Sequence, residues 1–463
     1  MIVAAAAAAS LLGTALFKQE FVKEPLPGIR YVQEIFASPP LVVHTVRFRA
    51  PENGFDMEAV LAKDRVLVTN GSVSRETVSS IARRTGAAVA INADFFGNDG
   101  DPLGLMIRDG RFISEPLWDR AVAAWAESTI LFDNPKWEAA VVRPDGSRLV
   151  IDGVNRAAKD GEIVLYTPDS GSLYTKFPAH AAVLEPTSPE LRIGVTEART
   201  LFIQPDLQSA ELPKDRWYLL GAGKAAPRIL RFFKQGETWR IELKLSGSIN
   251  WSAITHALGG GPLLVREGKP NVQGAAERFQ NDLVGRKHPR SALGTTQDGE
   301  IVLVVVDGRS PLSAGVTLEE LANLMIAKGC TRAINLDGGG SSALWVGGGI
   351  VNYPSDGTER PVANALALFA PHPIDPVLPF TIVAPATSVP VEGTLTLACR
   401  FADGKPVPSR EVLWSSKGAA WVDQGGNVRP LGPGSVTVTA WYRGQTATTT
   451  LLIVGKEALR PTG

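Results

Sequence analysis

Two short segments of the chain each place an asparagine two residues before an aspartate, directly after a run of apolar residues. They are Asn92-Ala-Asp94 and Asn335-Leu-Asp337. Because side chains alternate along a strand, the two polar side chains of each segment are expected on one face. Two related units can therefore bring four polar groups, two of them carboxylates, to one cleft. The alternative is a chance match, or Asn and Asp side chains that only cap their turns.

The second segment runs directly into a glycine-rich turn, Gly338-Gly-Gly-Ser341. Residues without a Cβ let backbone N–H groups approach a ligand closely. A second run, Gly259-Gly-Gly261, precedes an apolar strand and offers the same chemistry. Hairpin turns also use such runs, and neither run matches a P-loop or a dinucleotide fingerprint. Both turns are therefore candidate ligand-binding elements without a nucleotide assignment.

A third candidate edge of the site is the end of the apolar run 301–306, which stops at Asp307-Gly-Arg309. The segment before this run carries Arg290. A guanidinium presents several donors in a fixed plane that suits a phosphate or a carboxylate. Arg290 and Arg309 are therefore candidates for anion recognition, and a turn with a solvated Asp307 is the alternative.

The elements that must position these residues repeat as helix, glycine and buried strand. In the second unit Thr317 and Glu320 predict a capping box. The apolar residues that follow it have helical spacing, namely Leu318, Leu321, Ala322 and Met325. The first unit repeats this stripe with Val78, Ile81 and Ala82, and a glycine ends each helix, Gly86 and Gly329. This helix-strand echo predicts the α+β fold class, with a mixed α/β domain.

Proline density and strand-like alternation predict how the chain is divided. The predicted parts are 1–17, a signal peptide or N-terminal anchor; 18–40, a Pro-containing lead-in without regular structure; 41–370, the mixed domain; 371–379, a Pro-rich linker; 380–455, a β-sandwich; and 456–463, a tail. The segment VLWSSKGAAWVDQGGNV within the sandwich resembles bacterial Ig-like group 2 domains. We therefore expect a C-terminal all-β Ig-like sandwich that carries no chemistry.

Composition narrows the classes of function. The 47 Lys and Arg residues balance 47 Asp and Glu residues, which argues against a nucleic-acid partner. A hydrophobic fraction of 44% excludes a disordered chain. The two cysteines have no zinc-ligand spacing. The apolar run 2–17 is short for a membrane span, so it predicts a secreted or cell-envelope protein with no further integral membrane segment.

Five segments in order resemble the phosphodiester glycosidase family: INADFFG, ITHALGGGPLLVREGK, HPRSALGTTQDGEIVLVVVDGRS, SAGVTLEELANLMIAKGCTRAINLDGGGSSALWV and NYPSDGTERPVANAL. The resemblance lies within 41–370. It implies a hydrolase that cleaves a sugar-1-phosphodiester at the anomeric C–O bond and releases a free sugar and a phosphomonoester. The implied partner is a glycan or sugar phosphate, and no cofactor or metal is implied.

The resemblance also implies roles for individual residues. Cleavage of a glycosidic bond uses a carboxylate pair, so Asp337 is expected to act as base or nucleophile, with Asp307 or Asp94 as its partner. Arg290 is expected to act with them on the phosphate. The implied substrate-binding residues are Asn92, Gly338, Gly339, Gly340, Ser341, Asn352 and Arg360.

Two alternatives to this function stay open. A non-catalytic glycan-binding or cell-envelope assembly protein would use the same cleft without turnover. A metal-dependent phosphodiesterase would cleave the P–O bond instead. Among nearby residues, His256 and His288 are candidate acids, although a structural role is the commoner one for such histidines. Phe95, Trp345 and Tyr353 are candidates for stacking on a sugar ring.

Overall fold

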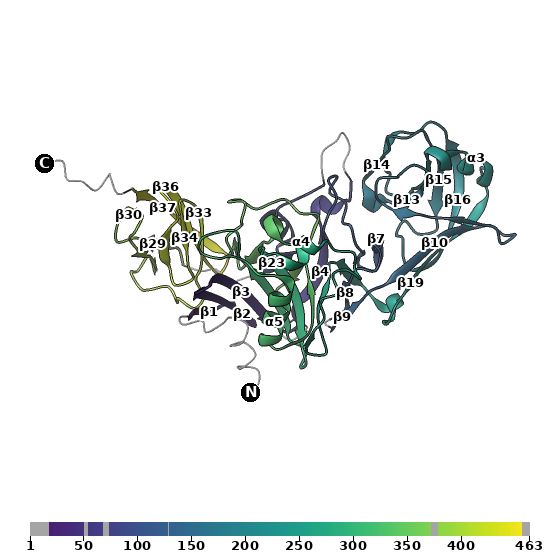
Figure 1. The fold of residues 1–463 in the computed structure, drawn as a ribbon. Coiled ribbons are helices and arrows are strands. Elements are labelled where there is room, and N and C mark those ends of the chain that lie inside the picture. The colour runs from purple at the N-terminus through teal and green to yellow at the C-terminus, as the bar shows by residue number, and fades with distance from the viewer. Residues whose placement is uncertain (1–17, 51–53, 68–73, 128, 372–377, 456–463) are drawn as a thin grey trace.

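The computed structural model describes residues 18–50, 54–67, 74–127, 129–371 and 378–455, and strands dominate it (Figure 1). The α-helices of these residues are short: α2 (Val78–Thr85), α3 (Ala226–Phe232), α4 (Asn281–Gly285) and α5 (Leu318–Ala327). The predicted α+β class is therefore wrong, and the main region is almost entirely β. The helix-strand echo is present, but its two helices are small additions to sheets built mostly from strands outside the echo.

The largest central sheet has eight strands in the order β1-β2-β3-β24-β23-β25-β21-β22. Their bounds are β1 (Lys18–Leu26), β2 (Ile29–Ala37), β3 (Pro40–Phe48), β24 (Ile301–Val306), β23 (Arg290–Thr296), β25 (Cys330–Asn335), β21 (Leu263–Arg266) and β22 (Lys269–Pro270). Helix α5 packs against β21 and β25. Its predicted apolar stripe is buried, and the predicted Thr317/Glu320 capping box is confirmed.

The lead-in predicted over 18–40 forms the first strands of this sheet. Strand β2 pairs with both β1 and β3. The prolines that suggested irregular structure lie at the ends of these strands, at Pro25 and Pro27 and at Pro39 and Pro40. Proline lacks the N–H that a sheet ladder needs, so it is tolerated at strand ends and turns. The expectation of no regular structure is therefore wrong.

A second central sheet carries the other unit of the echo. Its strands are β27 (Gly349–Ile350), β26 (Leu344–Val346), β5 (Val89–Asn92), β28 (Asn364–Phe369) and β4 (Asp56–Leu61), in that order. Helix α2 packs against β5. Thr77 caps this helix by accepting a hydrogen bond from Ser80 N, and Gly86 ends it in the left-handed conformation with φ 77°. Each unit of the echo therefore belongs to a different sheet.

The remaining strands before residue 260 form three further sheets, of which the smallest pairs β14 (Ser172–Tyr174) with β17 (Ser209–Glu211). One has the order β7 (Arg111–Ser114), β6 (Met106–Arg108), β20 (His256–Gly259), β8 (Val122–Ala126) and β9 (Thr129–Asp133). The chain between β9 and β20 forms the teal lobe of Figure 1, an eight-stranded sheet. Its order is β11 (Arg148–Val150), β10 (Lys136–Val142), β19 (Thr238–Ser246), β16 (Gly194–Gln204), β15 (Ala179–Pro186), β18 (Trp217–Ala222), β13 (Ile163–Tyr166) and β12 (Gly153–Val154).

Residues 380–454 form the yellow part of Figure 1, with an apolar core of their own. Their main sheet is β30 (Ser388–Pro390), β37 (Gln445–Val454), β36 (Gly434–Tyr442) and β33 (Leu413–Gly418). The smaller sheets are β31 (Leu395–Thr396), β35 (Asn427–Pro430) and β34 (Ala420–Val422), and β29 (Phe380–Val383) with β32 (Ala398–Phe401). This region contacts the central part directly, because Gln424 N donates to the buried Gln33 side chain at 2.8 Å.

Three sequence predictions fall partly or wholly outside the described residues. The signal peptide or anchor over 1–17 and the tail over 456–463 lie outside them, as does most of the linker over 371–379. Within the described part of the chain, no helix combines the length and the apolar character that a membrane crossing requires.

Candidate functional site

The two Asn-x-Asp units meet where their strands end. Asp337 N, in the turn after β25, donates to the carbonyl of Ala93 at 2.8 Å. Asn92, the last residue of β5, donates from Nδ2 to the carbonyl of Asp337 at 2.6 Å. The ends of two strands from different sheets are therefore joined at the segment that carries Asp337.

Asn92 has a structural role at this junction, not the substrate-binding role expected for it. Its side chain is completely buried. Besides the Asp337 carbonyl, it contacts Ser291 and Ala343, because its Oδ1 accepts from Ser291 Oγ at 2.8 Å and from Ala343 N at 3.1 Å. Its amide is therefore fully engaged by protein groups, and Asn92 positions the backbone of Asp337.

The Asp337 carboxyl is only partly exposed. Burial raises its pKa to about 6, although Ser341, the Gly338 amide, Arg360 and Arg120 all favour the charged form. Gly338 N donates to Asp337 Oδ1 at 2.9 Å, which fixes the orientation of the carboxyl. A carboxylate with a raised pKa at the edge of a site is suited to act as a base or nucleophile near neutral pH.

Asp94 lies deeper, with 1% of its surface exposed. Burial raises its pKa to about 7, and the charge of Asp337 adds to this rise. Its carboxyl accepts hydrogen bonds from Phe95 N at 2.8 Å and from Gly104 N at 2.6 Å. A Cβ on Gly104 or Gly259 would lie within 2.8 Å of Asp94 Oδ2, so both positions need glycine. Asp94 is thus an enclosed electrostatic partner of Asp337.

This packing also explains the second glycine run, 259–261. A Cβ on Gly260 would lie 2.7 Å from the carbonyl of Asn335, and one on Gly261 would lie 2.5 Å from Glu277 Oε2. The Asn335 side chain donates to the carbonyl of Gly261 at 2.8 Å. The run is therefore a close-packed strand crossing, and not the ligand cradle that it resembles in the sequence.

Asp307, the other predicted partner, is held in a buried polar chain. Its Oδ2 lies 3.2 Å from His44 Nε2, and His44 Nδ1 lies 2.7 Å from the hydroxyl of Tyr31. Tyr353 N donates to the same carboxylate at 3.2 Å. Asp307 is 4% exposed. These contacts give it a role in holding the 353 segment, and Asp94 is the candidate whose pKa responds to Asp337.

Arg290 is anchored to the backbone inside the protein, and its expected contact with phosphate stays a prediction. The residue is 2% exposed. Its guanidinium donates to the carbonyls of Val316 at 3.1 Å, Leu283 at 2.6 Å and Arg286 at 2.9 Å. These bonds use Nε and Nη2, which are three of the five N–H donors of a guanidinium. Arg290 therefore ties three backbone segments together.

The glycine turn after Asp337 also uses most of its amides internally. Gly338 N donates to Asp337 Oδ1, Gly339 N to the carbonyl of Pro289, and Ser341 N to the carbonyl of Gly338. The expected binding of phosphate or sugar by this whole set of amides is therefore not what the geometry favours. The hydroxyl of Ser341 is buried without a hydrogen-bond partner of standard geometry in the described part of the chain, so it stays a candidate ligand group.

Two arginines lie against this turn. A Cβ on Gly339 would lie 3.0 Å from the Arg309 guanidinium, and one on Gly340 would lie 2.2 Å from that of Arg360. Arg360 pairs with Asp356 at 2.7 Å, and 40% of its side chain is exposed. Its predicted position at the site therefore agrees with the structure. A side chain at Gly339 or Gly340 would require these arginine side chains to shift.

Asn352, predicted to bind substrate, is a buried turn residue. Its Oδ1 accepts from Leu344 N at 2.8 Å, and its Nδ2 donates to the carbonyl of Ser342 at 3.0 Å. Trp345 is 4% exposed and packs edge-on against Trp441, so it belongs to the core. Both side chains are buried among protein groups, so neither is placed to contact a sugar.

Arg120 is the residue that sequence reasoning missed. Its Nε and Nη1 are buried and have no hydrogen-bond partner among the described residues. The guanidinium lies 4.1 Å from the ring centre of Phe279 and 5.3 Å from that of Phe95. Its charge lowers the pKa of both Asp94 and Asp337. Arg120 lies in a loop outside every motif, and the only sequence feature that marks the position is the short run Trp118-Asp-Arg120.

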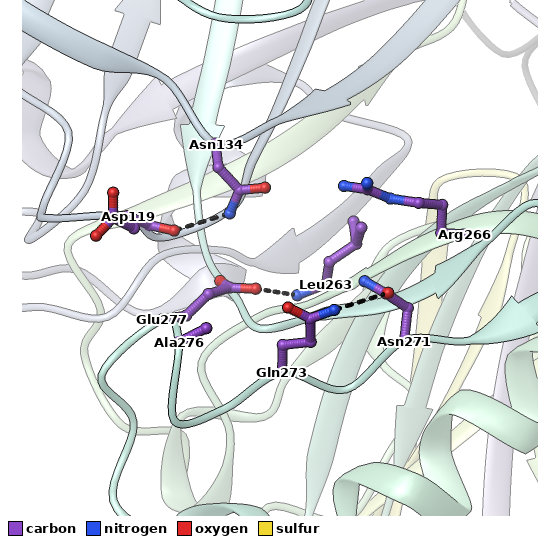
Figure 2. Close-up of a pocket in the computed structure, with 8 residues that line it drawn as sticks. All are labelled: Asp119, Asn134, Leu263, Arg266, Asn271, Gln273, Ala276 and Glu277. Carbon is purple, nitrogen blue, oxygen red and sulfur yellow. Dashed lines mark hydrogen bonds between the residues drawn. The ribbon is translucent and has the colours of Figure 1, made fainter.

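A pocket of about 180 Å³ adjoins the same loop (Figure 2). Glu277 connects the two, because it lines the pocket and its charge acts on Arg120. Its carboxylate accepts from Ala121 N at 2.8 Å and from Leu263 N at 2.9 Å. Other lining residues are polar, namely Asp119, Asn134, Arg266, Asn271 and Gln273. In the described ranges, no three His, Cys, Asp or Glu side chains are grouped as metal ligands.

Comparisons with known proteins match parts of the chain that include Asp337. Residues 214–369 match the phosphodiester glycosidase family. A Bacillus subtilis protein, the SPbeta prophage-derived uncharacterized protein YomE, is 27% identical over 301 residues, which are 65% of this chain and 31% of that protein. The N-acetylglucosamine-1-phosphodiester alpha-N-acetylglucosaminidase of Bos taurus is 37% identical over 83 residues, 18% of this chain and 15% of that enzyme.

The chain thus spans less than a third of the length of these two relatives. Among solved structures, a hypothetical protein from Synechocystis superposes with a TM-score of 0.62 at 25% identity, over 74% of this chain and 62% of that chain.

Proposed function

We propose that this protein hydrolyses a sugar-1-phosphodiester at the anomeric C–O bond, because residues 214–369 match the phosphodiester glycosidase family. The products are a free sugar and a phosphomonoester. The observation that carries this proposal is the pair of carboxyls at the junction of the echo units, partly exposed Asp337 and buried Asp94. Both have a raised pKa, which is common for carboxyls that transfer protons in catalysis.

Asp337 is the group placed to touch substrate. As a carboxylate it either attacks the anomeric carbon or takes a proton from the attacking water. The Gly338 amide and the Asn92 contact to its backbone hold it in one orientation. Asp94 is enclosed by backbone amides, so it acts by setting the charge state of Asp337. The leaving group is a phosphomonoester, whose negative charge has to be stabilised as the bond breaks. Arg360, which lies beside the glycine turn, can supply the positive charge.

Incubation of the purified protein with an aryl sugar-1-phosphodiester in ¹⁸O-labelled water tests the proposal. We expect release of free sugar with the label in the sugar. Asp337→Asn should lower release severely, while replacement of Asp145, a carboxylate in an exposed turn, by Asn should leave it unchanged. Label in the phosphate would show P–O cleavage and overturn the proposal. A raised thermal midpoint without sugar release would favour the glycan-binding alternative.

We also propose export to the cell envelope or beyond. The support is the uncharged apolar run over residues 2–17. Fractionation of cells that express the full chain, followed by N-terminal sequencing, tests this. A protein recovered outside the cytoplasm and lacking these residues is expected. Full-length protein recovered only from the cytoplasm would contradict export.

A further inference from the structure

Two buried nitrogen atoms of Arg120, Nε and Nη1, have no hydrogen-bond acceptor among the described residues. Buried polar groups in folded proteins are nearly always hydrogen-bonded, and leaving one unpaired is costly. The carboxyls of Asp94, Asp337 and Glu277 act on Arg120 through their charge. None of them meets hydrogen-bond geometry with its Nε or Nη1. These two donors are therefore available to an acceptor brought by a ligand.

Aromatic rings hold the guanidinium in place. Phe279 lies 4.1 Å from it, Phe95 5.3 Å and Trp118 5.7 Å, measured to the ring centres. Such contacts orient a guanidinium plane without using its hydrogen-bond donors. Trp118 is 49% exposed, so the aromatic cluster reaches the protein surface. The guanidinium is thus preorganised beside that surface, with Nε and Nη1 themselves buried.

The other arginines of the region already have polar partners. Arg290 donates to three carbonyls, Arg360 pairs with Asp356, and Arg309 lies 3.2 Å from His288 Nδ1. Arg120 differs from these three because its Nε and Nη1 have none among the described residues. Its charge also acts on both carboxyls of the candidate site. An anion bound by Arg120 would therefore lie in the electrostatic surroundings of Asp337.

We propose that Arg120 binds the anionic phosphodiester group of the substrate. It thereby makes the site selective for sugars whose anomeric oxygen carries an anionic phosphate group. This inference rests on the proposed function and adds the residue that recognises the phosphate. It assigns to Arg120 the contact that the sequence suggested for Arg290. A neutral glycoside of the same sugar gains nothing from Arg120.

The test compares Arg120→Gln and Arg120→Lys with Arg278→Gln. Arg278 is the matched control, because it lies 5.3 Å from the ring centre of the same Trp118 and is exposed. Two inhibition constants are measured against the aryl sugar-1-phosphodiester, one for inorganic phosphate and one for the neutral methyl glycoside. Thermal midpoints report on folding.

Arg120→Gln should raise the KM for the phosphodiester and the inhibition constant of phosphate on the order of 10- to 100-fold, the range for a lost hydrogen bond to a charged group. The inhibition constant of the neutral glycoside should stay within twofold. Arg120→Lys should fall between Gln and the wild type, since it keeps the charge and loses the planar fork. Arg278→Gln should change neither constant.

Unchanged phosphate inhibition in Arg120→Gln would overturn the proposal, as would equal losses for phosphate and neutral sugar. If Arg120→Gln does not fold, Arg120→Lys decides by the same two constants. If the wild type releases no sugar, the proposed function fails, and calorimetric titration with inorganic phosphate still tests Arg120. Phosphate binding that is lost in Arg120→Gln supports the inference, and absence of binding to the wild type refutes it.

Discussion

Asn92 and Asp337 are 245 residues apart in the chain and are joined by a hydrogen bond of 2.6 Å from the side chain of the first to the carbonyl of the second. This bond connects the end of β5 to the turn after β25. The predicted carboxyl of the site therefore depends on a buried amide in another sheet. Several consequences of this dependence can be measured.

Replacement of Asn92 should cost both stability and activity. Asn92→Ala leaves the Asp337 carbonyl, the Ser291 hydroxyl and the Ala343 amide without their partner. At 1–3 kcal/mol for each buried group left unpaired and with partial relaxation, we expect a loss of about 2 to 4 kcal/mol. Denaturant unfolding measures this. Ser291→Ala removes one of the three contacts and should cost less; an equal cost would contradict the central role of Asn92.

The two carboxyls should behave as one unit. Asp337→Asn and Asp94→Asn each keep the shape of the side chain and remove a charge, so each should lower sugar release, Asp337→Asn more severely. Because Asp94 acts through Asp337, the double variant should lose less than the sum of the single losses in activation free energy. Steady-state kinetics of the four proteins measure this. Full additivity, or an Asp94→Asn enzyme with normal activity, would show that the two act independently.

Folding stability should fall as pH rises from about 4 to 7 because of the same carboxyls. Their pKa values in the folded protein, about 7 for Asp94 and about 6 for Asp337, exceed the ordinary value of 3.8. The folded chain therefore binds more protons than the unfolded chain between these values, and deprotonation favours unfolding. Arg120 opposes this effect, since its charge lowers both pKa values.

Asp94→Asn isolates the contribution of one group. Its thermal midpoint relative to the wild type should rise progressively between pH 4 and 7 and stay level below pH 4. A constant difference across this range would mean that the pKa of Asp94 is not raised.

Arg290→Met should affect folding and spare substrate recognition. The three carbonyls that Arg290 ties together lose their donor, which we expect to cost about 2 to 4 kcal/mol. The folded fraction should keep the wild-type KM for the phosphodiester. Measurement of the active fraction by titration and of KM separates the two effects. A rise in KM for the phosphodiester in a variant of normal stability would show that Arg290 binds the phosphate group.

Deletion of residues 376–463 should destabilise the remaining chain. The sequence alone suggested that this part is separable, but Lys23 and Gln33 are buried against it and bond to Ser409 and Gln424. Trp441 also packs on Trp345. We therefore expect a lower thermal midpoint and aggregation for a chain that ends near Ala370. A truncated protein with the wild-type midpoint would show that these contacts contribute nothing.

Local signals in the sequence predicted the parts of the site that are encoded locally. The cap at Thr317 and the apolar stripe predicted α5. The repeat of Asn-x-Asp marked the two segments that are joined by hydrogen bonds at Asp337. The dominance of β structure escaped prediction, because strands such as β3 and β24 pair across a sequence distance that periodicity does not record. Prolines at the ends of β1 and β3 further obscured the first strands.

The arginines illustrate the same limit for function. A motif marks a position as part of a site without saying whether its side chain faces ligand or backbone. Arg290, within a motif, faces carbonyls, and Arg120, outside all motifs, faces the carboxyls. Only the three-dimensional arrangement separates an anchoring guanidinium from an available one.

Because β3 pairs with β24, the central sheet cannot form until the ribosome has synthesised the chain as far as β24. The first strands of the central sheet are synthesised early, but their neighbour β24 ends at Val306, and Gln33 meets Gln424 only 391 residues later. Until β24 is synthesised, β3 leaves one edge of the first three strands unpaired. Contacts of such long range make folding slow, so the nascent chain stays unfinished through most of translation, the state in which a polypeptide can still be threaded through a secretion channel.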